Sequence, residues 1–436
     1  MALSGIQIYK LLPQTNCKEC GFPTCLAFAM KLAAKQVELS ACPYVSEASK
    51  TQLAESAAPP MRLVTLKSDG HEVKVGNEVV LFRHEKTFYN RPGVFIKVRD
   101  DEDVKAKVEP ADKFIVSYVG IDLTIDGFAV EATGDPGRFA AAIKAVREVS
   151  KRPIVLISSD ATVVAAGLQL LNGETPLISG ADASNWEAMA DLAKASKAAL
   201  VVKADSIDAL ADLTEKIKAR GIEDLVIDPE TKNLGQLLTF STQVRRLALK
   251  KNVRSVGFPI VVFAGDAVLA AQAVAKYGGF VVLDEFKAET VYPLLVLRQN
   301  IYTDPQKPIQ VQPGLYEINN PRPESPVLVT TNFSITYFSV ANEVESSGLP
   351  AWLLVTDAEG MSVLTAWAAG KFDAERIAKA VKNFNVADKV SKKRVVLPGH
   401  VAVLSGELEA ELPGWEIKVG PREAVDIPAY YKQVLV

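Results

Sequence analysis

The chain has 436 residues, of which 48% are hydrophobic and 23% are charged, and its formal net charge at pH 7 is −3. This length exceeds one ordinary hydrophobic core and indicates about three domains. The near-neutral charge argues against nucleic-acid binding through a basic face, and no apolar run reaches the ~18 residues that would cross a bilayer. Because no secretory signal is recognisable at the N-terminus, the sequence predicts a soluble cytoplasmic protein.

All four cysteines lie near the N-terminus, with the spacing Cys17-x2-Cys20-x4-Cys25-x16-Cys42. Disulfide frameworks are typical of small secreted domains, whereas clustered thiols in a reducing compartment more often hold a metal. An iron–sulfur cubane needs four converging thiolates, and Gly21 permits the positive φ that a tight wrap around it requires. The sequence therefore predicts a 4Fe–4S cluster ligated by these four cysteines.

Two other interpretations of the cysteines stay open. Zinc usually binds two matched Cys-x2-Cys pairs, and only one such pair, Cys17 and Cys20, is present. Cys42 could instead be a buried small hydrophobic residue, which would leave three ligands. Apolar residues recur at helical spacing over residues 26–37, which predicts a helix that returns the chain to the cluster.

Three stretches of the chain differ in their pattern. Residues 1–58 are alanine-rich and helical in pattern, and they end before the proline pair 59–60, a candidate hinge. Residues 59–318 repeat a short β-branched run followed by a helical run. Residues 319–436 begin with a linker whose prolines disfavour both helix and strand.

The middle stretch predicts eight strands, most of them separated by helical patterns. The strands are expected at residues 78–83, 113–119, 154–158, 177–179, 199–202, 225–227, 260–263 and 280–283, and the clearest helices at 185–196, 206–220 and 266–277. Runs such as 260–263 are apolar at every position, as in parallel strands covered on both faces. Eight strand–helix repeats over ~250 residues predict a closed (β/α)8 TIM-like barrel, with an open doubly wound sheet as the alternative.

Aspartates follow several of these strands, namely Asp160, Asp205, Asp228, Asp266 and Asp284. Carboxylates at this end of a barrel often bind ligands or act in catalysis. Aspartate is also strongly preferred at helix N-caps. Both interpretations stay open, and capping is the favoured one.

The third stretch alternates strands and helices again. Strands are expected at residues 326–330, 351–356, 394–397, 401–404 and 416–419, and helices at 335–345 and after Met361. An α/β layer of ~115 residues is the size of a flavodoxin-like (Rossmann-like) domain. The predicted fold is therefore α/β, with a small helical four-cysteine module, a TIM-like barrel and a C-terminal flavodoxin-like domain.

Residues 9–25, which include three of the cysteines, resemble the start of the corrinoid iron–sulfur protein large (gamma) subunit of the anaerobic acetyl-CoA (Wood–Ljungdahl) pathway. Residues 328–338 and 355–362 resemble the opening of that family's corrinoid domain. The order of the three domains is similar to the family's plan along essentially the whole chain.

The resemblance implies a methyl-group carrier, a subunit rather than a self-standing enzyme. In that family the cobalt of a corrinoid, as Co(I), accepts a methyl group from methyltetrahydrofolate through a separate methyltransferase and passes it to acetyl-CoA synthase. Electrons from a low-potential donor pass through the 4Fe–4S cluster and return adventitious Co(II) to Co(I), which suits the low potentials of all-cysteine clusters. The resemblance also implies a heterodimer with a smaller barrel-containing subunit, with the corrinoid between the two.

Residues at the C-terminal ends of the predicted strands are the expected corrinoid contacts, because ligands of open α/β sheets bind there. They are Thr331, Asn332, Thr336, Thr356, Gly360, Met361, Ser362, Val363, Gly399, His400, Gly420 and Pro421. Hydroxyl and amide groups among them would bind the corrin's amide arms, and the glycines would let the backbone approach closely. Ordinary turns and helix caps are the alternative for each of them.

His400 lies in a Leu-Pro-Gly-His-Val segment. This segment lacks the Asp-x-His-x-x-Gly motif with which many corrinoid domains bind cobalt. The resemblance implies a corrinoid whose own base is displaced and whose cobalt has no protein histidine. We therefore interpret His400 as a loop residue near the corrin edge, and His71 and His84 as surface residues.

Two functions of other classes stay open. The first is an iron–sulfur electron-transfer subunit without its own corrinoid, which accounts for residues 1–58 only. The second is a barrel methyltransferase with a pterin site at the barrel aspartates and structural zinc at the cysteines. A bound corrinoid would distinguish the carrier from both, and iron content would distinguish the other two from each other.

Overall fold

The computed structural model describes residues 4–33, 36–47, 49–50, 53, 59–85, 87–231, 233–304 and 308–435. By their internal contacts these residues form two compact units. One unit is Met1–Val116 with Leu123–Tyr302, and the other is Ser117–Asp122 with Thr303–Val436. In the described part of the chain, no helix combines the length and hydrophobicity that crossing a membrane requires.

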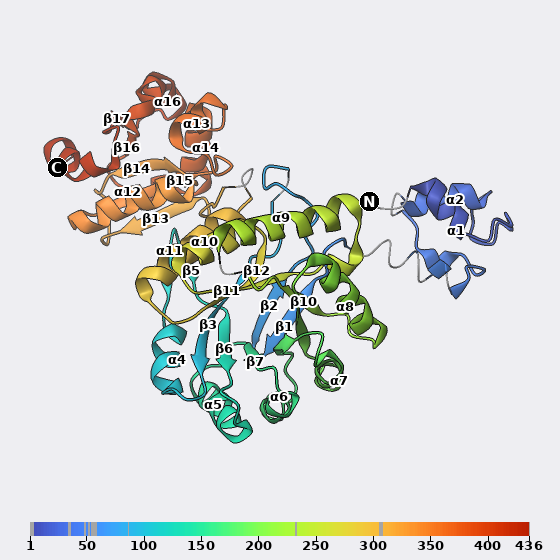
Figure 1. The fold of residues 1–436 in the computed structure, drawn as a ribbon. Coiled ribbons are helices and arrows are strands. Elements are labelled where there is room, and N and C mark those ends of the chain that lie inside the picture. The colour runs from blue at the N-terminus through green and yellow to red at the C-terminus, as the bar shows by residue number, and fades with distance from the viewer. Residues whose placement is uncertain are drawn as a thin grey trace. The chain divides into compact units, whose positions relative to one another are not determined.

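The N-terminal module contains helix α1 (Gly5–Leu11), helix α2 (Cys25–Ala33) and the 3₁₀ turn η1 (Leu39–Ala41) (Figure 1). A capping box begins α1, because the Ser4 hydroxyl accepts from the Gln7 N–H and the Gln7 side chain accepts from the Ser4 N–H. The helix expected over residues 26–37 is present as α2 only as far as Ala33, because residues 36 and 37 are not helical; residues 34 and 35 lie outside the described residues. The two helices enclose a small apolar core that includes Ile8 and Phe28.

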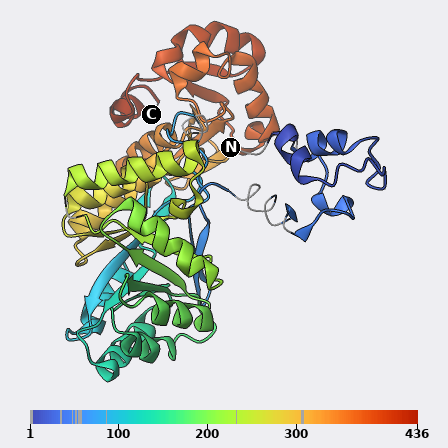
Figure 2. The ribbon, with the colours of Figure 1, turned by 45° about the vertical axis from the view of Figure 1, so that its right-hand side comes forward.

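Eight parallel strands close into a barrel, which confirms the TIM-like prediction and excludes the open sheet (Figure 2). In order around the barrel they are β3 (Gly93–Arg99), β6 (Gly127–Glu131), β7 (Ile154–Ile157), β8 (Leu177–Ala181), β9 (Ala199–Lys203), β10 (Leu225–Asp228), β11 (Ile260–Ala264) and β12 (Gly278–Leu283). A helix follows each strand: α4 (Val104–Asp112), α5 (Pro136–Val149), α6 (Ala161–Leu168), α7 (Trp186–Ser196), α8 (Ile207–Ala219), α9 (Leu234–Lys251), α10 (Ala267–Ala275) and α11 (Ala288–Tyr302).

Two of the strands predicted for the barrel are wrong. Residues 78–83 form no strand, and Leu81 instead packs in a small cluster beside α9. Residues 113–119 contain only the short β4 (Val116–Tyr118), which pairs with β5 (Ile121–Leu123) in a two-stranded sheet outside the barrel. Strands β3 and β6 occupy the places in the barrel that these segments were expected to fill.

A β-hairpin closes the N-terminal end of the barrel. Strands β1 (Val64–Ser68) and β2 (His71–Val75) are antiparallel, and their apolar side chains share one core with inward-facing residues of the barrel strands. The hairpin is tied to the loops that enter the strands, since Lys67 pairs with Thr175 just before β8. A ligand of this barrel would therefore approach from the C-terminal end, as in other TIM barrels.

The C-terminal domain is a five-stranded sheet in the order β13-β15-β14-β16-β17. The strands are β13 (Gly314–Ile318), β14 (Val327–Thr331), β15 (Ala351–Thr356), β16 (Arg394–Leu397) and β17 (Glu416–Val419). All are parallel except β13, which pairs antiparallel with β15 at the sheet edge and precedes residue 319, the expected start of this domain. Residues 401–404, predicted as a strand, belong to the 3₁₀ helix η3 (Gly399–Leu404).

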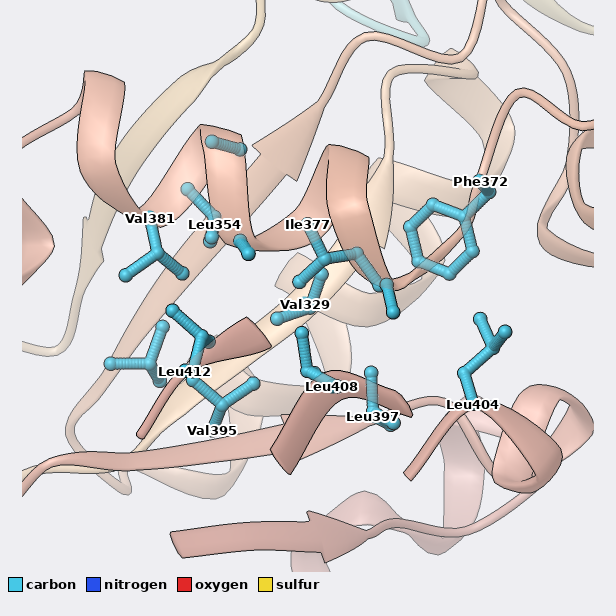
Figure 3. Close-up of a cluster of buried hydrophobic side chains, with 14 of the residues drawn as sticks. Val329, Leu354, Phe372, Ile377, Val381, Val395, Leu397, Leu404, Leu408 and Leu412 are labelled. Carbon is cyan, nitrogen blue, oxygen red and sulfur yellow. The ribbon is translucent and has the colours of Figure 1, made fainter. Parts of the chain in front are cut away.

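Helices cover both faces of this sheet. They are α12 (Ser334–Ser347), α13 (Val363–Ala368), α14 (Ala374–Asn383), α15 (Val386–Lys389), α16 (Ser405–Glu411) and α17 (Ile427–Tyr430). On one face, Val329 and Leu354 pack against Ile377 of α14 and Leu408 of α16 (Figure 3). Because side chains alternate along a strand, Leu328 points to the other face, where α12 and α17 pack.

Candidate functional site

A pocket of about 320 Å³ opens in the C-terminal domain, on the face of the sheet that α12 and α17 cover. Its walls include the C-terminal parts of β14 and β16, the N-terminal half of α12 and the loop after β17. The chain passes from β14 to β15 on one side and later returns to β16 on the other. The pocket therefore lies at the point where the strand order reverses, which is the usual ligand site of an open α/β sheet.

Half of the twelve residues predicted from the strand ends line this pocket. They are Thr336, Ser362, Val363, His400, Gly420 and Pro421. The other six lie at the same strand ends or shortly after them but outside the pocket wall, namely Thr331, Asn332, Thr356, Gly360, Met361 and Gly399. Several of these six hold the loops in place.

Asn332 fixes the loop that follows β15. Its buried Oδ1 accepts hydrogen bonds from the backbone N–H groups of Ala358 at 2.9 Å and Gly360 at 3.0 Å. Its Nδ2 donates to Asp357 Oδ1 and to Gln310 Oε1, both at 3.2 Å. Because the pocket-lining residues 362–364 follow directly, this side chain sets the position of one pocket wall.

Two glycines let the loops after β16 and β17 meet. The Gly399 N–H donates to Pro421 O at 2.9 Å, and the Gly420 N–H donates to Leu397 O at 2.8 Å. A Cβ atom on Gly399 would lie only 2.5 Å from Gly420 O, so a larger residue would push the loops apart. Gly399 thus lets the two loops approach each other, and its predicted approach to a ligand stays a prediction.

Two hydroxyl groups in the pocket wall have no hydrogen-bond partner in the structure. They belong to Thr330, at the end of β14, and to Tyr430, at the end of α17. The hydroxyls of Thr331 and Ser334 are also buried without partners, but these residues do not line the pocket. An unpaired buried hydroxyl costs about 1–3 kcal/mol, so unpaired hydroxyls in a pocket wall are natural ligand contacts.

His400 lies just after β16, in the 3₁₀ helix η3 instead of the expected loop, and its side chain is 34% exposed. Its Nε2 is 3.7 Å from Oε1 of Glu423, which lines the same pocket. The other two histidines, His71 and His84, are exposed, in agreement with their predicted surface positions.

Cys17 and Cys20 lie in the loop between α1 and α2, Cys25 begins α2, and Cys42 follows the 3₁₀ turn η1. Cys17 is exposed, Cys20 is half-buried, and Cys25 and Cys42 are buried. Asn16 links this loop to α2, since its N–H donates to Cys25 Sγ at 3.4 Å and its Oδ1 accepts from the Cys25 N–H at 2.8 Å. Backbone N–H groups directed at sulfur are a common feature of iron–sulfur sites.

The backbone of this loop turns repeatedly into the left-handed region. The residues with positive φ are Gln14, Asn16, Lys18 and Gly21. Alternation of this kind forms concave nests of N–H groups that bind anions, including iron–sulfur clusters. In the residues that the structure describes, no group of three or more His, Cys, Asp or Glu side chains is arranged to hold a metal ion. The ligand set therefore stays a prediction.

Two of the five barrel aspartates are helix N-caps, which is the interpretation that the sequence favoured. Asp160 accepts from the Thr162 N–H at 2.7 Å, and Asp266 accepts from the Val268 and Leu269 N–H groups at 2.9 and 2.8 Å. Helix α8 is capped by Ser206, so Asp205 is not its N-cap.

The remaining two aspartates, Asp228 and Asp284, begin no helix. Asp284 pairs with Nζ of Lys97 at 2.8 Å, and the same Nζ lies 3.5 Å from Glu131. Asp228 accepts the Glu230 N–H at 2.8 Å, and burial raises the pKa of its carboxyl group to about 6. Charged groups therefore lie at the C-terminal ends of these barrel strands.

Comparison with known proteins gives two family matches and close full-length relatives. Residues 63–431 match the family model of the CO dehydrogenase/acetyl-CoA synthase delta subunit, and residues 12–44 match that of a putative Fe–S cluster. The corrinoid/iron–sulfur protein large subunit of Moorella thermoacetica is 44% identical over 440 residues, covering 99% of this chain and 98% of that protein. The acetyl-CoA decarbonylase/synthase complex subunit gamma of Archaeoglobus fulgidus is 36% identical over 463 residues, with the same coverage of both chains.

Among solved structures, a dihydropteroate synthase from Xanthomonas albilineans is 14% identical to this chain, with a TM-score of 0.38. The match covers 56% of this chain and 100% of that one.

Proposed function

The chain belongs to the family of corrinoid/iron–sulfur protein large subunits and acetyl-CoA decarbonylase/synthase gamma subunits, and on this premise we propose that it carries methyl groups on a corrinoid. When bound, the corrinoid supplies the cobalt that accepts and donates the methyl group, while the protein supplies binding, orientation and access. In this proposal the methyl group comes from methyltetrahydrofolate through a separate methyltransferase and goes to acetyl-CoA synthase. The iron–sulfur module supplies the electron that restores Co(I) after oxidation.

The observation that carries the proposal is the pocket at the reversal of strand order, with unpaired hydroxyls of Thr330 and Tyr430 in its wall. A corrinoid brings amide arms and a nucleotide arm, which together offer both hydrogen-bond donors and acceptors. Its ring faces and its base are apolar, and nine of the 21 residues of the pocket wall are Leu, Val or Ile. In polarity these residues therefore suit a part of the cofactor, such as its base with a neighbouring polar group.

The strand order supports a flavodoxin-like corrinoid domain. Numbered along the chain, the parallel strands β14, β15, β16 and β17 lie in the order 2-1-3-4, which is the beginning of the flavodoxin-like order 2-1-3-4-5. We include β13 in this domain because it pairs with β15 along its whole length. The proposed domain therefore begins before residue 319.

We propose that the corrinoid binds with its lower base displaced from cobalt, and that the base enters the pocket beneath α12 and α17. The displaced base is what the family resemblance implies, and the segment around His400 lacks the motif that would direct a histidine to cobalt in its place. The pocket also continues from the strand ends along the face of the sheet, because Leu328 lines it as well as Thr330.

For the N-terminal module we propose a 4Fe–4S cluster ligated by Cys17, Cys20, Cys25 and Cys42. The family model that matches residues 12–44 spans all four. Cys25 is the first residue of α2, where the helix dipole favours the negative charge of a thiolate. The left-handed turns of the preceding loop bring backbone N–H groups towards the same region.

The archaeal relatives are named as subunits of the acetyl-CoA decarbonylase/synthase complex. We propose that this chain likewise works in an assembly, as the large subunit of a heterodimer with a smaller barrel-containing subunit. The methyltransferase, acetyl-CoA synthase and a low-potential electron donor would then be its transient partners.

Metal analysis of the heterodimer, purified without oxygen, tests the function. We expect about four iron atoms and one cobalt atom per large subunit, with corrinoid absorption bands that change on reduction. Cys42→Ala should lower the iron content and leave cobalt in place, whereas the exposed Ser40→Ala should change neither. Iron without cobalt would favour an electron-transfer subunit, and zinc in place of iron would contradict the cluster.

A further inference from the structure

Tyr430 places a lone polar atom in an apolar part of the pocket. Its hydroxyl group is buried and has no hydrogen-bond partner in the structure. The nearby wall is formed by Leu328, Val396 and Ile427. Burial raises the pKa of Tyr430, so the hydroxyl keeps its proton near neutral pH and stays available as a donor.

Tyr430 lies towards the amino ends of β16 and β17. The charges of Arg394 and Glu416, which begin β16 and β17, are close enough to act on its hydroxyl group. Both residues are at the amino ends of their strands, whereas Thr330 and Pro398 line the pocket at the carboxyl ends. The Tyr430 hydroxyl is therefore placed to contact the part of a ligand that extends from the strand ends along the face of the sheet.

The displaced base of a corrinoid has a chemical need that this hydroxyl can meet. A benzimidazole or purine base binds cobalt through a ring nitrogen, and displacement leaves that nitrogen with a free lone pair. In an apolar pocket an unpaired acceptor of this kind is costly, and one donor removes the cost. A phenolic base has no such nitrogen and gains nothing from the donor.

Resting on the proposed function, in which the base enters this pocket, we propose that Tyr430 determines which corrinoids the protein accepts. Its hydroxyl group donates a hydrogen bond to the base nitrogen that has left cobalt. The protein therefore prefers corrinoids with a benzimidazole or purine base to those with a phenolic base.

The neighbouring tyrosine is a matched control. Tyr431 is also buried, but its hydroxyl donates to Pro350 O at 2.5 Å and it does not line the pocket. Tyr431→Phe thus removes the same atom from an adjacent residue without touching the proposed contact. Tyr430→Phe keeps the ring and its packing, so it removes only the donor.

The experiment measures equilibrium binding of three corrinoids to the full-length chain with its smaller subunit, by absorbance after ultrafiltration, and needs no turnover. The corrinoids are cobalamin, a corrinoid with a phenolic base, and cobinamide, which lacks the nucleotide arm. We expect Tyr430→Phe to weaken cobalamin binding about tenfold, as loss of one buried hydrogen bond predicts. Binding of the phenolic corrinoid should change less than about twofold, and Tyr431→Phe should leave the ratio of the two affinities unaltered.

The possible outcomes distinguish failure of the role of Tyr430 from failure of the proposed carrier function on which it rests. If the wild-type protein binds none of the three corrinoids, the proposed carrier function fails. If it binds cobalamin and cobinamide equally well, the base is not held in the pocket and the role of Tyr430 fails while the carrier function stands. Equal losses of affinity for cobalamin and the phenolic corrinoid in Tyr430→Phe would also overturn the proposed role of Tyr430. The ratio of the affinities for cobalamin and the phenolic corrinoid is the same whether or not part of the variant protein is unfolded, because unfolding lowers both apparent affinities equally.

Discussion

Asp228→Asn should make the barrel more stable at neutral pH. Asp228 is the last residue of β10, and its carboxyl group accepts one backbone hydrogen bond, from Glu230. Lys203, whose charge acts against the rise in the Asp228 pKa, pairs with Glu230 Oε1 at 3.1 Å. Burial raises the pKa of Asp228 from 3.8 to about 6, and the charge of Glu230 adds to this effect.

The size and sign of the effect follow from this shift in pKa. In the unfolded chain the carboxyl group loses its proton near pH 4, whereas in the folded protein it keeps the proton up to about pH 6. Between these values the folded state binds more protons, so stability is lost as the pH rises through this window and stays lost above it. A shift of ~2 units at ~1.4 kcal/mol each sets an upper limit of about 3 kcal/mol. Because Asp228 is partly exposed, solvent screening reduces this destabilisation, and we expect Asp228→Asn to gain roughly 1–2 kcal/mol of stability at neutral pH.

Urea unfolding of the wild type and Asp228→Asn, followed by circular dichroism at pH 4.5 and 7.5, measures the effect. Asparagine keeps the acceptor for the Glu230 N–H but carries no charge, so the variant should gain stability over the wild type mainly at pH 7.5. The measurement at pH 4.5 is the internal control. An equal difference at both pH values, or a variant less stable at pH 7.5, would refute the reasoning.

Two further substitutions test groups that hold the barrel and the pocket. Arg298 is 1% exposed, donates to the Pro92 and Thr124 carbonyl oxygens and pairs with Asp126. Arg298→Met should cost about 3–5 kcal/mol in urea unfolding, because Asp126 then keeps a mostly buried charge whose other cation, Arg91, lies 3.9 Å away. Asn332→Ala leaves backbone N–H groups of the loop after β15 unpaired, so it should lower stability by about 2–3 kcal/mol and weaken corrinoid binding by about tenfold in the ultrafiltration assay.

Exposed residues of the same types are the controls. Arg99→Met removes a surface ion pair with Asp101 and should cost less than about 1 kcal/mol. Asn172→Ala lies far from the pocket in sequence and in the other compact unit, and should leave corrinoid affinity unchanged. A small cost for Arg298→Met, or unchanged corrinoid binding in Asn332→Ala, would contradict the roles assigned to these side chains.

The sequence predicted the later barrel strands better than the first two, for a physical reason. Strand β11 is apolar at every position because both of its faces are covered, and it was found almost to the residue. Strands β3 and β6 carry Lys97 and Glu131, which pair with each other at 3.5 Å. A search for continuous apolar runs misses strands whose charges are compensated by a neighbouring strand.

The false strand at residues 78–83 shows the opposite error. Its run of Val, Leu and Phe has the composition of a strand, yet Val79 and Phe82 are each 43% exposed. Glu78 is buried there because it pairs with Arg245 of α9 at 3.1 Å. A tertiary ion pair from far along the chain thus decides the conformation, and local composition carries no sign of it.

The sequence also predicted some residues of the candidate site and missed others. The rule that ligands lie at strand ends found Thr336, Ser362 and His400, because that rule depends only on strand order. It missed Tyr430, which reaches the pocket from α17 near the end of the chain. Whether a buried hydroxyl has a partner is a property of the folded molecule, so no pattern in the sequence marks it.

The segment Ser117–Asp122 has a consequence for work with excised fragments. It belongs to the second compact unit, although residues 123–302 separate it from the rest of that unit. Gly120 lies so close to Phe338 of α12 that a Cβ atom there would be 2.8 Å from the ring. During synthesis the ribosome therefore releases the first piece of this unit long before the remainder, and its final assembly waits for the last third of the chain. A fragment that starts at Thr303 would expose Phe338 to solvent, and we expect it to require the missing segment, supplied as a fused or separate peptide, to regain its full stability.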